Sequence, residues 1–166
     1  MIPVEVMGIR LEVPSNQPVL LLKDLERPRY LPLWIGTAEA TSISLAIDEI
    51  HTSRPLTHDL LVTVLEEFGA ELESVSISEL IEGTFYAVLQ FANHDSISVR
   101  PSDAIAVAVR TGVPMYVAPE VMDEAGMEFT DEELAEGDQQ EAAPLTQQDI
   151  EQFKQFLENI NPEDFS

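Results

Sequence analysis

The sequence predicts an α+β domain followed by an acidic linker and a C-terminal helix. Two patterns predict the domain: segments in which apolar and polar residues alternate, as in half-buried strands, and segments with apolar residues at helical spacing. A change in charge predicts the tail, because residues 120–166 contain 15 acidic residues and one basic residue, against 16 and 7 before them. With 45% hydrophobic residues, the 166-residue chain can bury one substantial core.

Three strands are predicted near the N-terminus. Residues 4–11 alternate between apolar and polar or small side chains, and Pro14-Ser15-Asn16-Gln17 has the composition of a turn. Apolar runs at 19–22 and 31–35 predict two more strands. Because proline cannot donate a ladder hydrogen bond, Pro32 predicts that the third strand lies at an edge or a bulge.

Two helices are predicted next. The first covers residues 38–50, with Thr37 as its N-cap, and the second begins at a Thr57 cap and ends at Gly69. The apolar stripe of the first helix comprises Ala40, Ile43, Ile47 and Ile50. The predicted buried face of the second comprises Leu60, Leu61, Val64, Leu65 and Phe68.

A hairpin and a third helix complete the predicted core. Residues 72–78 and 84–91 alternate at strand spacing, with a turn at Glu82-Gly83. The third helix runs through residues 103–110 and stops before Gly112, and its apolar character predicts deep burial. A strand at 113–117 and a helical turn at 121–125 follow.

The chain therefore divides into a domain at 1–129, a flexible acidic linker at 130–145 and a C-terminal amphipathic helix and tail at 146–166. The apolar stripe of the last helix must dock on its own domain or on a second copy, so we expect a homo-oligomer.

Composition excludes several kinds of protein. The absence of cysteine removes disulfides, thiolate metal ligands and thiol nucleophiles. No signal peptide and no apolar run of ~20 residues is present, so we expect a cytoplasmic protein with no membrane partner. His51 and His94 lack metal-ligand spacing and are assigned to no site. The net charge of −23 opposes non-specific binding of nucleic acid.

Two helix starts share one motif. Arg54-Pro55-Leu56-Thr57-His58-Asp59 and Arg100-Pro101-Ser102-Asp103 each combine Arg-Pro with a hydroxyl residue and an acid in the first turn. One explanation is structural, because proline, the hydroxyl and the acid all favour a helix start. The other is functional, because the free amides of a helix N-terminus and a nearby arginine can hold a phosphate.

The functional explanation assigns chemistry to particular residues. Hydrolysis of a phosphodiester needs a positioned water, neutralisation of phosphoryl charge and a proton for the leaving oxygen. A divalent cation such as Mg²⁺ or Mn²⁺ could be held by Glu39, Asp59 and Asp103. Arg54 and Arg100 could bind phosphate, and His58 could move protons.

These motifs, together with Leu31-Pro32-Leu33-Trp34-Ile35-Gly36, Glu39-Ala40 and the GTFYA segment at 83–87, resemble the bifunctional nuclease domain family. The resemblance covers about residues 2–128 and implies a mixed β-sheet with helices packed on it. It implies a nuclease of RNA, DNA or both. The negative net charge favours single-stranded or short nucleic acid as the substrate. The motif positions that could form a site are Glu39, Arg54, Thr57, His58, Asp59, Arg100, Ser102 and Asp103. From the chemistry of their side chains we expect catalysis by Glu39, His58, Asp59 and Asp103 and phosphate binding by Arg54, Thr57, Arg100 and Ser102.

A second hypothesis is a non-catalytic interaction or regulatory module. In that case the motifs form salt bridges and caps, and the acidic tail meets a basic partner. Residues 1–119 alone have a net charge of −9, from the 7 basic and 16 acidic residues counted above, which would repel a nucleic acid duplex.

Overall fold

The computed structural model describes residues 1–12 and 15–128, which lie in one compact unit, Met1–Thr130. The predicted linker at 130–145 and the predicted helix at 146–166 lie outside the described residues. The described strands are β1 (Ile2–Glu12), β2 (Gln17–Asp24), β3 (Arg29–Trp34), β4 (Leu72–Ile81), β5 (Thr84–Phe91), β6 (Ile97–Val99), β7 (Met115–Val117) and β8 (Met127–Glu128). The described helices are α1 (Thr37–Ile47), α2 (Thr57–Glu67), α3 (Pro101–Thr111) and α4 (Pro119–Ala125).

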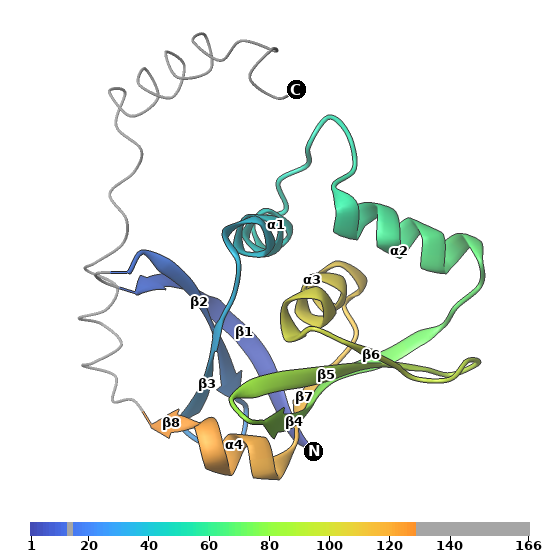
Figure 1. Ribbon diagram of the computed structural model, residues 1–166. Coiled ribbons are helices and arrows are strands. Elements are labelled where there is room, and N and C mark those ends of the chain that lie inside the picture. Colours follow the sequence, from blue (N-terminus) through green and yellow to red (C-terminus); the bar gives the residue numbers. More distant parts are fainter. Residues whose placement is uncertain (13–14, 129–166) are drawn as a thin grey trace, which may run out of the picture. The chain divides into compact units, whose positions relative to one another are not determined.

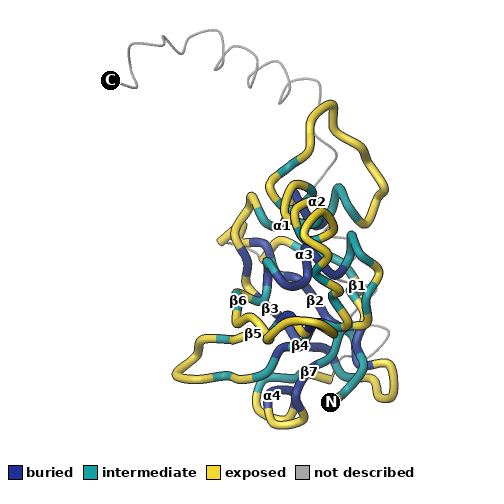
Figure 2. The backbone as a smooth tube through the Cα atoms, turned by 90° about the vertical axis from the view of Figure 1, so that its right-hand side faces the viewer, coloured by how far each residue is buried: buried dark blue, intermediate teal, exposed yellow. Residues whose placement is uncertain are grey.

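The eight described strands form one mixed sheet in the order β6-β5-β4-β7-β1-β2-β3-β8. The β4–β7 pair is parallel, and the other pairs among the described strands are antiparallel. Figures 1 and 2 place α1, α2 and α3 on one side of the sheet and α4 on the other. The predicted α+β fold with a mixed sheet is confirmed.

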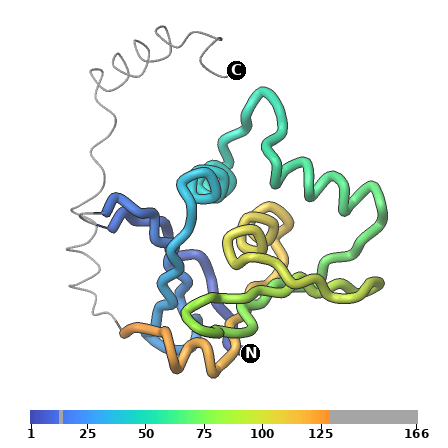
Figure 3. The backbone as a smooth tube through the Cα atoms, viewed as in Figure 1, coloured from blue at the N-terminus to red at the C-terminus, as the bar shows by residue number. Residues whose placement is uncertain are grey.

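Helix α3 lies at the centre of the helical layer. It packs against α1 and α2 and against strands β4 and β5 (Figure 3). Residues 104–108 are all buried, as its apolar composition predicts, and Figure 2 shows this stretch among the buried segments. The fully buried side chains beneath it come mainly from the sheet and include Leu20, Leu22, Leu31, Leu33, Val75, Ile77 and Val117.

The predicted strands are confirmed, and two short ones were not predicted. Glu82 and Gly83 both have positive φ, 49° and 78°, which is the backbone that a tight two-residue hairpin between β4 and β5 requires. Pro32 pairs with Leu21 of β2 on one side. On the other side of β3, the described residues of β8 pair with Arg29 and Tyr30 and do not reach Pro32. Pro32 therefore lies at an open edge, as predicted. β6 and β8 span only three and two residues, too few for a periodic pattern.

The helix starts differ from the prediction by one residue in α1 and α2 and by two residues in α3. The N-cap positions are Gly36, Leu56 and Arg100, and none of them caps through its side chain by a described hydrogen bond. Thr37 and Thr57 are instead the first residues of α1 and α2. The two Arg-Pro motifs also occupy different positions relative to their helices. Pro101 is the first residue of α3, whereas Pro55 precedes Leu56, the N-cap of α2.

The predicted buried face of α2 was wrong. In the described part of the chain, no residue of α2 is buried, and Leu60, Val64 and Phe68 are exposed, Phe68 by 82%. Leu65 alone among the predicted five packs partly against the core. α1 likewise ends at Ile47, and the predicted stripe residues Ile47 and Ile50 are exposed. The apolar pattern is present, but the neighbours of α2 in the described chain do not cover it.

None of the described helices is long and apolar enough to cross a membrane.

Candidate functional site

The first turns of α1, α2 and α3 meet at one cavity of about 490 Å³. Its lining comprises Ala38, Glu39, Thr41, Ser42, Leu45, Leu56, Thr57, His58, Arg100 and Asp103. Each of the three helices has an acid at its third position, where the helix dipole stabilises a negative charge. Because unpaired amides of a helix N-terminus attract anions, the cavity lies where a phosphate would be stabilised.

Arg100 is the exposed cation of this cavity. Its Nε donates to Oδ2 of Asp103 at 2.8 Å, and its Nη2 donates to Oδ1 of Asp103 at 2.9 Å and to Oε1 of Glu39 at 3.0 Å. These two carboxylates raise the pKa of Arg100 above its ordinary value. The side chain is still 66% exposed, and Nη1 donates to no described residue. Arg100 therefore keeps two N–H groups free for a ligand.

Gly36 makes room for one of these carboxylates. A side chain at Gly36 would collide with the carboxylate of Glu39, which folds back over the start of α1. The sequence Gly36-Thr37-Ala38-Glu39 thus places an acid against Arg100 without obstruction from the helix start.

Asp103 is ionised despite partial burial. Burial alone would raise its pKa, but hydrogen bonds from Arg100 and His58 and the attraction of their charges outweigh it and hold the pKa below its ordinary value. Nε2 of His58 lies 3.3 Å from Oδ1 of Asp103. Asp103 is therefore a proton acceptor shared by an arginine and a histidine.

The hydrogen bonds on the other side of His58 favour one tautomer. Arg110 can only donate, so Oγ of Ser42 accepts from its Nη2 at 3.0 Å. The hydroxyl proton of Ser42 can then point to Nδ1 of His58, 2.9 Å away. A neutral imidazole that accepts at Nδ1 carries its proton on Nε2, facing Asp103. The contacts therefore favour the Nε2–H form of neutral His58.

Arg110 joins the three helices behind the cavity. Its side chain is 8% exposed, and its Nε donates to Oδ1 of Asp59 at 2.5 Å. Its other contacts are the carbonyl oxygens of Ala106 and Ser42, at 2.9 and 3.1 Å, and the Ser42 hydroxyl. Asp59 also accepts from the backbone amide of Leu56 at 2.7 Å. The hydrogen bonds from Arg110 and Leu56 lower the pKa of Asp59.

The structure brings together some of the predicted site residues and separates others. Glu39, Thr57, His58, Arg100 and Asp103 line the 490 Å³ cavity. Three predicted residues do not line it. Asp59 pairs with Arg110, and Arg54 is exposed in the loop between α1 and α2. Ser102 is buried at the second position of α3.

Sequence reasoning did not find Ser42 and Arg110. Ser42 follows Glu39 by three positions on α1, and Arg110 lies in the last turn of α3, where a basic residue also favours the helix dipole. Neither belongs to a motif, and their roles depend on contacts between helices that are distant in sequence. The spacing of Ser42 from Glu39, one helical turn, is the signal that could have placed it on the same face.

The three carboxylates expected to share a divalent cation do not form one group. Among residues 1–12 and 15–128, no set of three His, Asp or Glu side chains is arranged to hold a metal ion. The reason is that arginines take up these acids: Arg100 binds Glu39 and Asp103, whereas Arg110 binds Asp59 at the other side of His58. The described donor set therefore does not fit a three-carboxylate cation site.

Comparison with known proteins identifies the family. The model of the bifunctional nuclease domain matches residues 20–130, which include every candidate site residue. The chain belongs to the bifunctional nuclease domain family. The cavity between the three helix starts is therefore a feature of a bifunctional nuclease domain.

Relatives of two kinds were found. An uncharacterized protein of Mycobacterium tuberculosis (strain H37Rv) is 44% identical over 162 residues, covering 98% of this chain and 96% of its own. Rice proteins are more distant: bifunctional nuclease 2 of Oryza sativa subsp. japonica is 30% identical over 62% of this chain, and bifunctional nuclease 1 of subsp. indica is 27% identical over 68%. The matched regions cover 34% and 35% of these rice proteins, so the chain corresponds to about a third of their length.

Proposed function

We propose that this chain is a nuclease that hydrolyses phosphodiester bonds in single-stranded or short RNA or DNA. Membership of the bifunctional nuclease domain family supports the reaction class, as do the printed names of the rice relatives. The observation that carries the proposal is the contact of Arg100, Asp103 and His58 in one cavity. These residues supply a phosphate-binding group, a base and an acid within hydrogen-bond distance of one another.

Arg100 is the phosphate-binding residue of this mechanism. Its two free N–H groups on Nη1 face away from the two carboxylates that hold it, and a planar guanidinium matches the oxygens of a phosphate. Glu39 and Asp103 fix the guanidinium in place, so little rotamer freedom is lost when a phosphate binds. The hydroxyl of Thr57, at the first position of α2, lines the same cavity and is a second phosphate contact.

Asp103 acts as the base and His58 as the acid. The neutral Nε2–H form of His58 has no lone pair at Nε2, so His58 cannot act there as the base. To act as the acid it first gains a second proton at Nδ1, and Ser42 can accept a hydrogen bond from that N–H. Asp103 is ionised and accepts the proton of the attacking water, whose oxygen forms the new bond to phosphorus. The bond from phosphorus to the leaving oxygen breaks, and protonated His58 gives its Nε2 proton to that oxygen.

The contact between His58 and Asp103 also returns the site to its starting state. After one turnover Asp103 holds the proton taken from water, and Nε2 of His58 has lost its own. Since these atoms lie 3.3 Å apart, the proton can pass directly from Asp103 to His58. Ser42 keeps the ring oriented in both states, because its hydroxyl can donate to Nδ1 or accept from it.

Charge supports short or single-stranded substrates over long duplexes. Residues 1–119 have a net charge of −9, and within this range only 7 residues are basic. A duplex carries one phosphate charge per ≈1.7 Å along its axis and would be repelled by such a surface. A short strand that reaches Arg100 and the three helix starts brings fewer charges near the acidic surface.

The test measures cleavage of labelled single-stranded RNA and DNA by the purified full chain. We expect cleavage by the wild type and a loss of about 100-fold or more in kcat/KM for Asp103→Asn, which keeps the shape of the side chain but removes the base. Asp95→Asn is the matched control, since Asp95 is an exposed loop acid that does not line the cavity. Thermal unfolding of both variants separates loss of chemistry from loss of fold.

Three other outcomes would change the interpretation. Equal cleavage by the wild type and Asp103→Asn would show that the activity comes from another site or a contaminant. Loss of cleavage in a chelator, with Mg²⁺ or Mn²⁺ restoring it, would show that a divalent cation takes part and would replace the acid–base route. Absence of cleavage by the wild type would favour the non-catalytic interaction module.

A further inference from the structure

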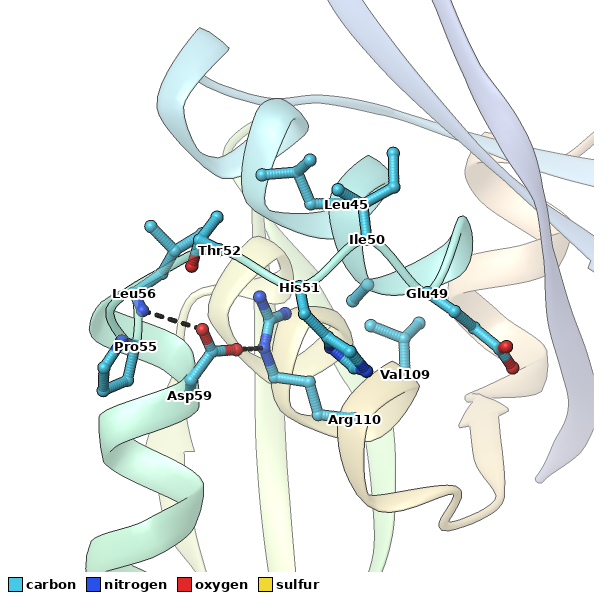
Figure 4. Close-up of a pocket in the computed structure, with 11 residues that line it drawn as sticks. Leu45, Glu49, Ile50, His51, Thr52, Pro55, Leu56, Asp59, Val109 and Arg110 are labelled. Atoms are coloured by element: carbon cyan, nitrogen blue, oxygen red, sulfur yellow. Dashed lines mark hydrogen bonds and ion pairs between the residues drawn. The ribbon is translucent and has the colours of Figure 1, made fainter.

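A second and larger cavity lies beside the proposed site. It has a volume of about 710 Å³ and is bounded by the end of α1, the loop before α2, the first turn of α2 and the last turn of α3 (Figure 4). Leu45 and Leu56 line both cavities, so the two share a wall. The proposed mechanism makes no use of this space.

The walls of the second cavity are partly aliphatic and partly polar. Its apolar lining comprises Leu45, Ala46, Ile50, Pro55, Leu56 and Val109. Ile50 is 54% exposed although it lines a hollow, so its apolar surface is available to a ligand. The volume lies in the range of sites for small organic ligands, and the lining offers such a ligand both apolar and polar surface.

The charged groups of this cavity disfavour an anion. Figure 4 shows Asp59 and Arg110 turned toward each other, and this pair offsets the one cation of the lining. Glu49 adds a further carboxylate at the edge. Arg110 is buried and already donates from Nε, Nη1 and Nη2 within the fold, so a phosphate would meet no exposed arginine here. An uncharged ring would meet aliphatic side chains and the polar groups of His51 and Thr52.

We propose that this cavity binds the nucleobase next to the phosphate held by Arg100. The inference rests on the proposed function and specifies its substrate. The two neighbouring cavities match the two chemical parts of a nucleotide. The anionic group meets the exposed Arg100 at the helix starts, and the neutral ring meets the aliphatic and polar side chains of the second cavity. A base can enter the second cavity only when it is unstacked and unpaired, so single strands are bound in preference to duplexes.

The test compares two exposed isoleucines that lie three residues apart. Ile50 lines the second cavity, whereas Ile47 is 45% exposed and lines neither cavity, so Ile47→Ser is the matched control for Ile50→Ser. The probe is a thymidine dinucleotide, titrated against the full chain carrying Asp103→Asn so that it is not consumed. Two further probes each lack one of the two thymines.

We expect Ile50→Ser to weaken binding of the dinucleotide about fivefold, as expected for loss of a partly buried aliphatic group. Ile47→Ser should leave the Kd of the dinucleotide unchanged. The probe that lacks the thymine bound in the second cavity should bind equally to the Ile50→Ser and Ile47→Ser chains. Equal affinity of the Ile50→Ser and Ile47→Ser chains for the dinucleotide would overturn the inference, as would undiminished binding of both base-deficient probes.

Failure of the inference and failure of the proposed function give different results. Cleavage by the wild type without any effect of Ile50→Ser on binding would leave the nuclease and remove the base site. Base-dependent binding at Ile50 without cleavage would keep the cavity as a nucleobase site and remove the nuclease.

Discussion

Replacing Arg110 with methionine should release α2 from the rest of the domain. Methionine keeps much of the aliphatic stem of the side chain but none of its five N–H donors. Arg110 contacts Asp59 of α2, Ser42 of α1 and the carbonyl of Ala106 in its own helix. Since no residue of α2 is buried within the described chain, these polar contacts carry much of the attachment of α2.

The expected cost follows from the burial of the pair. Removing one partner of a fully buried ion pair costs ~3–5 kcal/mol, because the remaining charge has no counterpart. The side chain of Asp59 is 38% exposed, so water can solvate part of its charge after the substitution. We therefore expect a loss of about 2 kcal/mol in the free energy of unfolding and a fall in Tm of roughly 6–12 °C.

The assay is hydrogen exchange of the backbone amides, combined with thermal unfolding. In Arg110→Met the amides of α2 should lose protection, while those of β4 and β5 keep theirs relative to global stability. Arg27→Met is a suitable control, because the side chain of Arg27 is exposed and has no described partner. Unchanged protection in α2 would refute the reasoning and show that the contacts of Leu65 with the core hold the helix.

Three further predictions follow from the same contacts. The pKa of Asp103 is lowered in the folded state, so the stability that its carboxylate contributes is present above pH ~4 and is lost as the pH falls through the folded pKa. In urea unfolding between pH 3 and 7, Asp103→Asn should therefore lose less stability on acidification than the wild type. Equal losses in the two proteins would contradict this. ¹⁵N NMR of neutral His58 should show the Nε2–H tautomer, and Ser42→Ala should shift the population toward the other form, whereas identical spectra would remove Ser42 as the residue that sets it. If a second copy covers the exposed apolar face of α2, as the expectation of a homo-oligomer suggests, Phe68→Glu should lower the mass measured by sedimentation, and the expectation fails if the wild type sediments as a monomer at all concentrations.

The strands and the core helix could be predicted because their signals are local. The β4–β5 hairpin needs a positive φ at two adjacent residues, and the Glu82-Gly83 pair between two alternating segments predicts this turn from the sequence. α3 is apolar on nearly every side, so burial was the expected outcome whatever packs around it. α2 differs because its stripe shows only that an apolar face exists. The partner of that face cannot be deduced from periodicity, and the described chain leaves it exposed.

The candidate site could be predicted in part for a similar reason. His58, Arg100 and Asp103 belong to helix-start motifs whose chemistry is visible in a few adjacent residues. The spacing of Ser42 from Glu39 could place it on the same helix face, but its contact with Arg110 spans 68 positions of sequence, and no local pattern encodes such a contact. The same limitation explains the expected cation site. Glu39, Asp59 and Asp103 were expected to share a cation, but Arg100 binds Glu39 and Asp103 whereas Arg110 binds Asp59, and the sequence does not show which arginine each acid meets.

The two arginines have different tasks, and their hydrogen bonds distinguish them. Arg110 is buried and its contacts are spent on Asp59, Ser42 and a helix carbonyl, so its loss should lower both stability and activity. Arg100 is 66% exposed and retains two free N–H groups, but its partners Glu39 and Asp103 are only 19% and 28% exposed. Removing the charge at this position should therefore lower stability as well as cleavage. Arg100→Lys, which keeps the charge but loses the planar fork, should lower cleavage strongly with a smaller effect on the unfolding transition. A large loss of stability in that variant would mean that Arg100 holds the helix starts together and is not reserved for a phosphate.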